Sequence, residues 1–298
     1  MAEFNASQFT VAKSKPLPVI LLLDTSGSMN TVVNPDEVVR TGRTGIVEGQ
    51  PVEYVSGGKS RIDVLNEAVR RMLGTLTKEA SQANEFLVSV VTFGGTATLK
   101  QAPVPASAFK YTDLPADGGT PLGAAIDVAK SLIEDREQIP SRAYRPLVVL
   151  VSDGEPTDSW ESKLASFIQD GRSAKCDRMA LGIGEEATGG RGRAMLERFI
   201  AGTEHKVFEA KDAGEVHNFF KFVTMSVVSR SLSQNPNLVP PDATLKPPTP
   251  APAASKAVPA APAVPEPSKS APAGPAASAH APSPSATTTD PEKEDSYW

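Results

Sequence analysis

Hydrophobic and polar positions change in blocks along roughly the first 230 residues. The runs Leu17–Leu23 and Leu147–Val151 are apolar throughout, which is typical of strands covered on both faces. In Arg61–Thr77, apolar residues recur every three or four positions on one stripe, as in a helix: Ile62, Leu65, Val69, Met72 and Leu76. Strands that alternate with helices in this way predict an α/β fold, with a doubly wound, mainly parallel sheet flanked by helices.

The remaining blocks continue this alternation. Gly94-Gly95 is expected to turn one strand back along its neighbour, and Pro121 is expected at the first position of a helix, where its missing N–H does no harm. The predicted strands are Phe86–Phe93, Thr96–Lys100, Arg178–Ile183 and Lys206–Phe208. The predicted helices are Pro121–Asp135, Trp160–Asp170, Ala194–Ile200 and Glu215–Val228.

Two segments depart from the alternation. Residues 30–59 hold several glycines and a possible hairpin around Thr44–Val55, and an insertion of this length in a domain is uncommon unless it is functional. From about Ser231 onward Pro, Ala and Ser dominate, so this stretch lacks the apolar side chains that offset the entropy cost of ordering. We therefore expect a folded domain at residues 1–230, with the insertion inside it, and a disordered Pro/Ala/Ser-rich tail at residues 231–298.

Composition narrows the classes of function. The formal net charge of −5 argues against a dedicated nucleic-acid binder. No apolar run reaches the length of a membrane span, and Met1–Lys15 lacks the apolar core of a signal peptide. Cys176 is the only cysteine, so no intrachain disulfide can form. These features predict a soluble, cytoplasmic protein with neither a nucleic-acid nor a membrane partner.

A short polar motif follows the first apolar run. Asp24, Ser26 and Ser28 place three oxygen-bearing side chains at alternate positions where a buried strand would end. Hard oxygen donors suit Mg²⁺ or Mn²⁺. In isolation, the same string also fits a strand-to-loop turn rich in helix-capping residues.

Two further loops supply candidate ligands. Thr120 follows Gly118-Gly119 just before a predicted helix, and Asp153 follows the strand Leu147–Val151. Ligand sites in doubly wound sheets lie beyond the carboxyl ends of the strands, so these side chains can converge with Asp24, Ser26 and Ser28 on one face.

The three motifs together resemble the von Willebrand factor type A (VWA) domain with its metal-ion-dependent adhesion site (MIDAS), over roughly Leu17–Val228. The resemblance implies that Ser26 and Ser28 ligate Mg²⁺ directly, and that Thr120 does so directly or through water. Asp24 and Asp153 would hold coordinated waters. It also implies a non-catalytic protein-interaction module, in which a partner's Asp or Glu binds at the open position of the metal.

The chain is also similar to VWA proteins of the tellurium-resistance (TerY-type) group. The matching segments are Pro18–Met29, Val88–Phe93, Gly118–Ala125, Val151–Asp158, Ala180–Glu186 and Phe219–Ser226. Proteins of that group are bacterial and cytoplasmic, and are encoded beside a Ser/Thr protein kinase and a PP2C-type phosphatase. The resemblance thus implies a stress-response or tellurium-resistance role, whereas residues 30–59 and the tail are less typical of the group.

Alternative functions keep part of the same site. A metal-dependent phosphohydrolase could use Asp24 as nucleophile, but it needs a second Asp two residues later, where this chain has Ser26. Because Ser26 replaces that second Asp, we expect no enzymatic activity. A VWA subunit that couples to an AAA+ ATPase, as in chelatases, would keep the whole site and change only the partner.

Several other residues are candidates for simpler roles. Gly189–Arg193 is expected to be a flexible basic loop, whose Arg191 and Arg193 could border the metal face and meet an acidic partner. Trp298 is either a docking residue or part of an unstructured terminus. Cys176 is expected to be a small packed residue. The three histidines, His205, His217 and His280, are expected on the surface or partly buried, and not in a zinc site.

Overall fold

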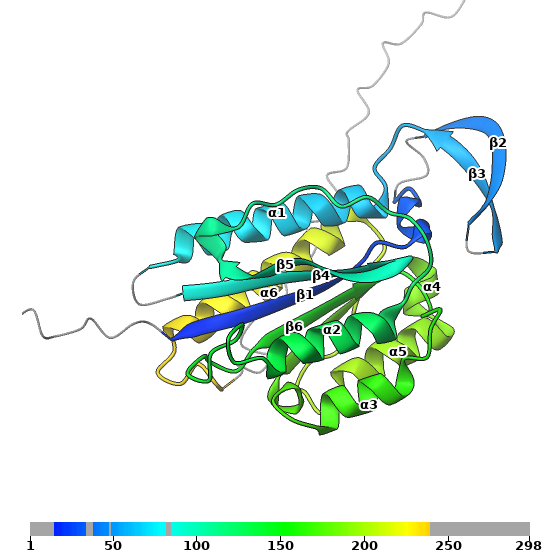
Figure 1. Cartoon of the computed structure of the whole chain (residues 1–298). Coiled ribbons are helices and arrows are strands. Elements are labelled where there is room, and N and C mark those ends of the chain that lie inside the picture. The colour runs from blue at the N-terminus through cyan, green and yellow to red at the C-terminus, as the bar shows by residue number, and fades with distance from the viewer. Residues whose placement is uncertain (1–14, 34–37, 48, 82–84, 239–298) are drawn as a thin grey trace, which may run out of the picture. The chain divides into compact units, whose positions relative to one another are not determined.

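A six-stranded sheet runs through the structure, a computed structural model that describes residues 15–33, 38–47, 49–81 and 85–238 (Figure 1). All of these residues lie in the first of the two units into which the chain divides, residues 1–253. The strand order is β5-β4-β1-β6-β7-β8, and every neighbouring pair is parallel except β4 and β5. The predicted α/β fold with a mainly parallel sheet is therefore confirmed. The strands are β1 (Pro16–Asp24), β4 (Glu85–Gly94), β5 (Thr96–Pro105), β6 (Leu147–Ser152), β7 (Asp177–Ile183) and β8 (Phe208–Ala210).

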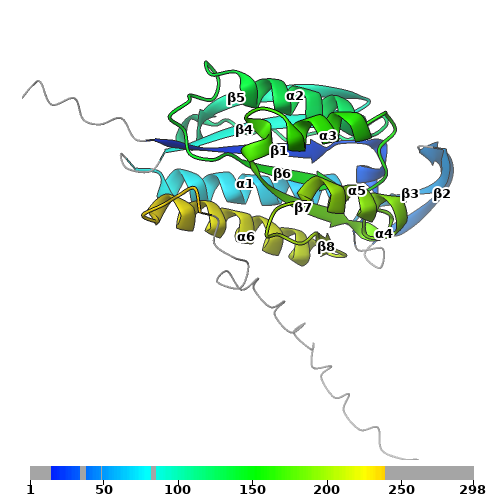
Figure 2. The ribbon, with the colours of Figure 1, turned by 90° about the horizontal axis from the view of Figure 1, so that it is seen from below.

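Helices cover both faces of this sheet. Figure 2 shows α1 and α6 on one side and α2 and α3 on the other. Leu21 and Leu23 of β1 belong to the core beneath α1 and α6, whereas Ile20 and Leu22 belong to the core shared with α2, α3 and α5. Because neighbouring side chains of a strand point to opposite faces, β1 is apolar on both faces up to Leu23, and only its last residue, Asp24, is charged. The helices are α1 (Arg61–Glu79), α2 (Leu122–Glu134), α3 (Glu161–Gln169), α4 (Gly184–Thr188), α5 (Gly190–Ile200) and α6 (Ala213–Leu232).

A capping box determines where α1 begins. The Ser60 side chain accepts a hydrogen bond from the Asp63 backbone N–H, and the Asp63 carboxylate accepts one from the Ser60 N–H at 3.0 Å. This reciprocal pair satisfies two donors that the first helical turn would otherwise leave unpaired. It places Arg61 at the first helical position, at the carboxyl end of the sheet.

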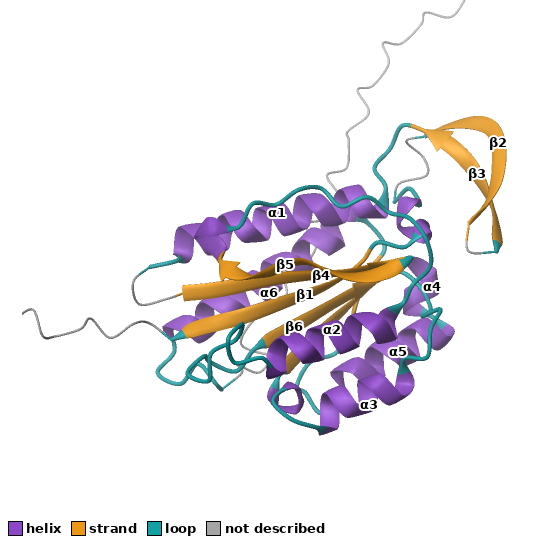
Figure 3. Ribbon diagram, in the orientation of Figure 1, coloured by secondary structure: helices purple, strands orange, loops and turns teal. Residues whose placement is uncertain are grey.

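The insertion contains a long hairpin that stands apart from the main sheet (Figure 3). Strands β2 (Val39–Val47) and β3 (Gln50–Ser56) pair antiparallel and form a sheet of their own, so the hairpin is longer than the expected Thr44–Val55. The chain enters it after a 3-10 turn, η2 (Gly27–Asn30), and leaves it at Ser60. Both ends of the insertion are therefore anchored beside the Asp24–Ser28 motif.

The expected flexible loop at Gly189–Arg193 is wrong, because residues 190–193 form the first turn of α5. The short helix α4 precedes it directly. A Cβ on Gly192 would stand 2.5 Å from the Glu186 carbonyl oxygen, so this glycine allows α4 and α5 to pack closely. Gly192 is therefore needed for close packing between α4 and α5, and it does not mark a loop.

The start of α2 differs by one residue from the prediction. Pro121 is the N-cap, with φ −79° and ψ 67°, and the first helical residue is Leu122. Asp158 caps the helix instead, since its two carboxylate oxygens accept the N–H groups of Gly123 and Ala124, both at 2.9 Å. The loop that carries Thr120 is thereby tied to the loop after β6.

Candidate metal centre

Three loops at the carboxyl end of the sheet are joined by backbone hydrogen bonds. The Gly27 N–H donates to the Gly118 carbonyl at 2.8 Å, and the Asp117 N–H donates to the Thr25 carbonyl at 2.8 Å. A Cβ on Gly94 would stand 2.1 Å from the Thr25 carbonyl oxygen, so only glycine allows the end of β4 to lie this close.

Asp24 lies at the base of the site with no solvent exposure. Its Oδ1 accepts the Ser26 backbone N–H at 2.9 Å, and its Oδ2 accepts the Ser152 hydroxyl at 2.7 Å. Both carboxylate oxygens are therefore oriented by neighbouring loops. The Ser152 hydroxyl at the end of β6 thus helps to orient the Asp24 carboxylate at the end of β1.

The two serine hydroxyls of the motif lie beside each other. Ser26 Oγ and Ser28 Oγ are 3.0 Å apart, and the Ser28 hydroxyl donates to Asp153 Oδ1 at 2.8 Å. Four of the five predicted ligands are thus connected through hydrogen bonds: Asp24, Ser26, Ser28 and Asp153.

Thr120 supplies the test of whether a cation fits. Its N–H donates to Thr157 Oγ1 at 3.0 Å and its carbonyl accepts the Thr157 N–H at 2.9 Å. Both backbone polar groups of Thr120 therefore have hydrogen-bond partners. The Thr120 hydroxyl is buried and has no hydrogen-bond partner among the described residues. A buried polar atom without a partner is costly, and a hydroxyl facing a cation would be satisfied. The donor set of hydroxyls and carboxylates is of the kind that hard divalent cations prefer.

Buried negative charge favours a cation at the same place. Burial raises the pKa of Asp24 to about 7, and the nearby Asp153 charge adds to this shift. Burial also raises the pKa of Asp153, although the positive charge of Arg61 opposes this effect. A divalent cation would offset the repulsion between the two carboxylates and lower both pKa values.

Arg61 is part of the site and was not predicted from the sequence. Its Nη1 lies 2.9 Å from Asp153 Oδ2, and its Nη2 lies 3.1 Å from Glu186 Oε2. The contact joins residues 92 positions apart, and no local motif indicates it. Arg61 uses one oxygen of Asp153 and Ser28 the other, so the orientation of this carboxylate is determined by both.

The two predicted partner-binding arginines have different environments. The Arg191 side chain is 90% exposed, and its Nη1 lies 3.9 Å from Glu155, two residues after Asp153. Arg193 instead makes ion pairs within the chain, with Glu197 at 2.9 Å and with Glu209. Of the two, Arg191 is therefore the more exposed, and it lies beside the metal loops. Trp298 lies outside the described residues.

The histidines and the cysteine have structural roles. His205 is buried, contrary to the expected surface or partly buried position, because its Nε2 lies 3.1 Å from the buried Asp177 carboxylate. His217 is partly buried, and His280 lies outside the described residues. Within the described ranges, no three His, Cys, Asp or Glu side chains gather as a metal site. Cys176 is buried, and burial raises the pKa of its thiol to about 12, as suits a packed residue.

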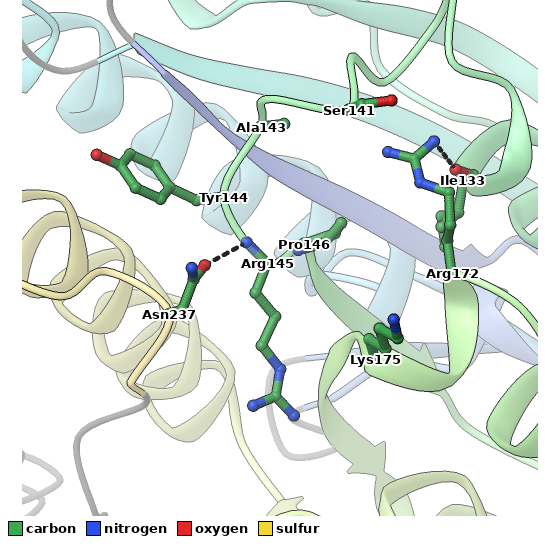
Figure 4. Close-up of a pocket in the computed structure, with 9 residues that line it drawn as sticks. All are labelled: Ile133, Ser141, Ala143, Tyr144, Arg145, Pro146, Arg172, Lys175 and Asn237. Atoms are coloured by element: carbon green, nitrogen blue, oxygen red, sulfur yellow. Dashed lines mark hydrogen bonds between the residues drawn. The ribbon is translucent and has the colours of Figure 1, made fainter.

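A pocket of about 560 Å³ lies at the opposite end of the sheet, where the Tyr144 N–H donates to the carbonyl of Pro16 at the start of β1. It contains none of the predicted metal ligands. Arg145 and Arg172 both line it, but Figure 4 shows their guanidinium groups pointing in different directions. That of Arg172 is bound to the carbonyls of Ile133 and Ile139. We therefore do not assign the chemistry of the protein to this pocket.

Comparison with known families finds a matching family model. Residues 19–155 match the family model described as von Willebrand factor type A domain. The match covers 137 of the 298 residues and shows that this stretch is similar to the VWA family. The match spans all five predicted metal ligands, from the end of β1 to the loop after β6. No curated protein is significantly similar to the chain in sequence.

Solved structures of similar fold come from diverse sources. A von Willebrand factor type A protein from Catenulispora acidiphila is 20% identical, with a TM-score of 0.48, covering 72% of this chain and 43% of its own. The PilB minor pilin from Streptococcus sanguinis is 17% identical, with a TM-score of 0.47, covering 74% and 63%. Proximal thread matrix protein 1 from the mussel byssus, with a zinc-occupied MIDAS motif, is 16% identical, with a TM-score of 0.47, covering 72% and 48%. The chain thus spans less than two thirds of each of these proteins. No helix in the described part of the chain is long and apolar enough to cross a membrane.

Proposed function

We propose that the VWA domain of this protein is a non-catalytic interaction module whose bound divalent cation, Mg²⁺ or Mn²⁺, accepts a carboxylate from a protein partner. The hydroxyls of Ser26, Ser28 and Thr120 and the carboxylates of Asp24 and Asp153 would hold the cation. The observation that carries the proposal is the buried Thr120 hydroxyl, which has no partner among the described residues and lies in a loop hydrogen-bonded to the Ser26–Ser28 loop.

The type of donor supports a docking role. Serine and threonine hydroxyls carry no net charge, so a cation that they hold keeps most of its charge and attracts an anionic ligand. Mg²⁺ in proteins usually retains waters, which an incoming Asp or Glu can displace. In this arrangement Asp24 orients the Ser26 backbone and Asp153 orients the Ser28 hydroxyl through hydrogen bonds, and Arg61 orients Asp153.

The environment of Asp24 supports a non-catalytic role. A phosphohydrolase needs a nucleophilic carboxylate that can reach its substrate. Asp24 is fully buried, and both of its oxygens accept hydrogen bonds from Ser26 and Ser152. These contacts suit a carboxylate that organises a site and does not itself attack a substrate.

The cellular role we propose is regulation or scaffolding in a bacterial stress-response system of the tellurium-resistance type. A Ser/Thr kinase and a PP2C-type phosphatase would be the partners. This part of the proposal rests on the motif resemblance across Pro18–Ser226. The genes beside the one that encodes this chain test it directly, since an AAA+ ATPase gene there would favour the chelatase-like alternative instead.

The binding mechanism is tested by pull-down of the purified products of those neighbouring genes, in Mg²⁺ and in EDTA. We expect binding in Mg²⁺ that falls at least about tenfold in EDTA and in Asp24→Ala, because both remove the cation. Thr98→Val, on the exposed part of β5, is the matched control and should bind normally. Binding that survives both EDTA and Asp24→Ala would exclude the metal bridge, and phosphatase turnover lost in Asp24→Ala would restore the enzyme alternative.

A further inference from the structure

The β2–β3 hairpin exposes apolar side chains next to the candidate metal centre. Val39 is 71% exposed, Ile46 76% and Tyr54 50%. Neither strand pairs with the main sheet among the described residues. Two-stranded hairpins are marginally stable by themselves, and exposed apolar residues next to a binding site commonly mark an interaction surface.

The register of the hairpin shows which edge is open. In antiparallel pairs, opposed residues alternate between pairs that exchange hydrogen bonds and pairs whose N–H and C=O groups point outward. Val47 pairs with Gln50 across two intervening residues, the arrangement of a tight hairpin in which the last pair is hydrogen-bonded. Ile46 then faces Pro51 in an outward-pointing pair, which agrees with the absence of an N–H on proline.

By the same alternation, Thr44 and Glu53 form the next outward-pointing pair. The outer edge of β3 is thus interrupted by Pro51, which cannot donate a hydrogen bond. The outer edge of β2 instead presents the backbone groups of Thr44 and Ile46. Because β2 pairs only with β3 in the described part of the chain, this edge is free to accept another strand.

The β2 edge ends at the metal loop. Val47 is the last residue of β2, and its Cγ1 lies 2.9 Å from the position that a Cβ on Gly27 would occupy. Gly27 stands between the two hydroxyl donors, Ser26 and Ser28. A strand bound along β2 would therefore run toward the candidate cation.

The charge of β2 indicates the chemistry of such a strand. The segment Val39–Val47 contains two arginines and no acidic residue. Arg40 remains 81% exposed although it contacts Glu53 at 3.1 Å. Arg191, beside the metal loops, is 90% exposed. An acidic segment would complement these charges, and a basic one would be repelled.

We propose that the edge of β2 binds an extended, acidic segment of the protein partner as a third strand of the hairpin, and that the same segment supplies the carboxylate to the cation. The inference rests on the proposed function and specifies how its partner binds. Main-chain hydrogen bonds to Thr44 and Ile46 supply affinity, and the metal selects the position of the acidic residue.

The direct test is amide hydrogen exchange by NMR on the full chain. The probe is a synthetic peptide of about ten residues, alternating valine and threonine, with Asp at one end and Glu at the other. In the free protein, the amides of Thr44 and Ile46 should exchange fast, while those of Gly45 and Val47 are protected by β3. Peptide in Mg²⁺ should slow the first two at least about tenfold and leave the other two unchanged.

A matched pair of double variants separates the edge from the fold. Thr44→Pro with Ile46→Pro removes both outward N–H groups without removing a bond to β3, whereas Thr44→Val with Ile46→Val keeps them. We expect the proline variant to bind the peptide about tenfold more weakly, with unchanged spectra in the main sheet, and the valine variant to bind like wild type.

Three outcomes overturn the inference: no binding of the peptide to the wild type, equal binding by the two double variants, or no added protection at Thr44 and Ile46. A wild-type dimer that the proline variant abolishes would also overturn it, because the edge would then serve a second copy of the chain. Edge-dependent binding that persists in EDTA and in Asp24→Ala would support the strand site and reject the metal bridge of the proposed function.

Discussion

The environment of Thr120 favours threonine over valine only if a cation is bound beside its hydroxyl. Its backbone is satisfied by Thr157, while its hydroxyl is buried without a partner in the described structure. Valine has almost the same shape as threonine and would remove the unpaired polar atom. The local protein environment by itself would therefore favour valine at this position.

Replacing Thr120 by valine should separate metal binding from folding. In EDTA, we expect the free energy of unfolding to stay the same or to rise by about 1 kcal/mol, because an unsatisfied buried hydroxyl is removed. In Mg²⁺, the increase in Tm that the cation gives the wild type should be reduced or lost. Thermal unfolding with and without the cation measures both effects, with Thr98→Val as control. A variant that is destabilised in EDTA but still gains Tm from the cation would contradict the assigned role.

Asp24 should make cation binding depend on pH. Its pKa in the metal-free fold is raised to about 7 by burial and by Asp153, so below pH 7 it is mostly protonated. The cation binds the deprotonated form, and binding must release this proton. We expect the affinity for Mg²⁺ to fall by up to about tenfold per pH unit below 7, and this contribution to level off above 7. Calorimetry in buffers of different ionisation enthalpy measures the released proton. An affinity that is constant between pH 5 and 7 would contradict the prediction.

At the scale of elements, glycines allow three loops to meet at the carboxyl end of the sheet. Gly118 has φ +75°, and a Cβ there would stand 2.5 Å from Gly95 Cα. Gly154, in the loop after β6, has open space around its Cβ position. Position 118 therefore requires glycine and position 154 does not, although each glycine stands in one of the sequence motifs.

Gly118→Ala should therefore be destabilising and Gly154→Ala should not. We expect the first to lower the free energy of unfolding in EDTA by about 2 kcal/mol or more, because alanine is strained at positive φ and clashes with backbone atoms that cannot move aside. Denaturant unfolding of both variants measures the difference. Equal stability of the two alanine variants would mean that the loops are not packed as closely as the structure indicates.

The periodicity of the sequence predicted the main strands and most helices within a few residues, because the sheet is covered on both faces and its strands must be apolar. It did not predict α4 or the start of α5, since Gly189, Gly190 and Gly192 resemble a loop in sequence while Gly192 is required for packing. The spacing of Asp24, Ser26 and Ser28 also indicated the candidate site. Arg61 and Asp158 could not be predicted, because each acts on a loop that is far away in sequence.

At the scale of the whole molecule, the end of the folded part differs from the compositional boundary. The sequence predicted a domain that ends at residue 230, where the Pro- and Ala-rich composition begins. In the structure, α6 continues to Leu232, and the chain after it remains in contact with the domain. The fully buried Arg230 donates from Nε to the Pro236 carbonyl at 3.1 Å. Asn237 Oδ1 accepts the Arg145 N–H at 2.8 Å.

Two truncations test where the folded unit ends. Removing residues 239–298 should leave Tm unchanged, because none of these contacts is lost. Ending the chain at residue 230 should lower the free energy of unfolding by about 2–4 kcal/mol. The buried Arg230 guanidinium keeps the Arg145 carbonyl as an acceptor but loses that of Pro236, and the Arg145 N–H loses Asn237. Thermal and denaturant unfolding in EDTA compares the two without a contribution from the cation. If the two truncated chains are equally stable, residues 231–238 contribute nothing to the fold. If instead the chain that ends at 238 is destabilised, the region beyond it supports the domain.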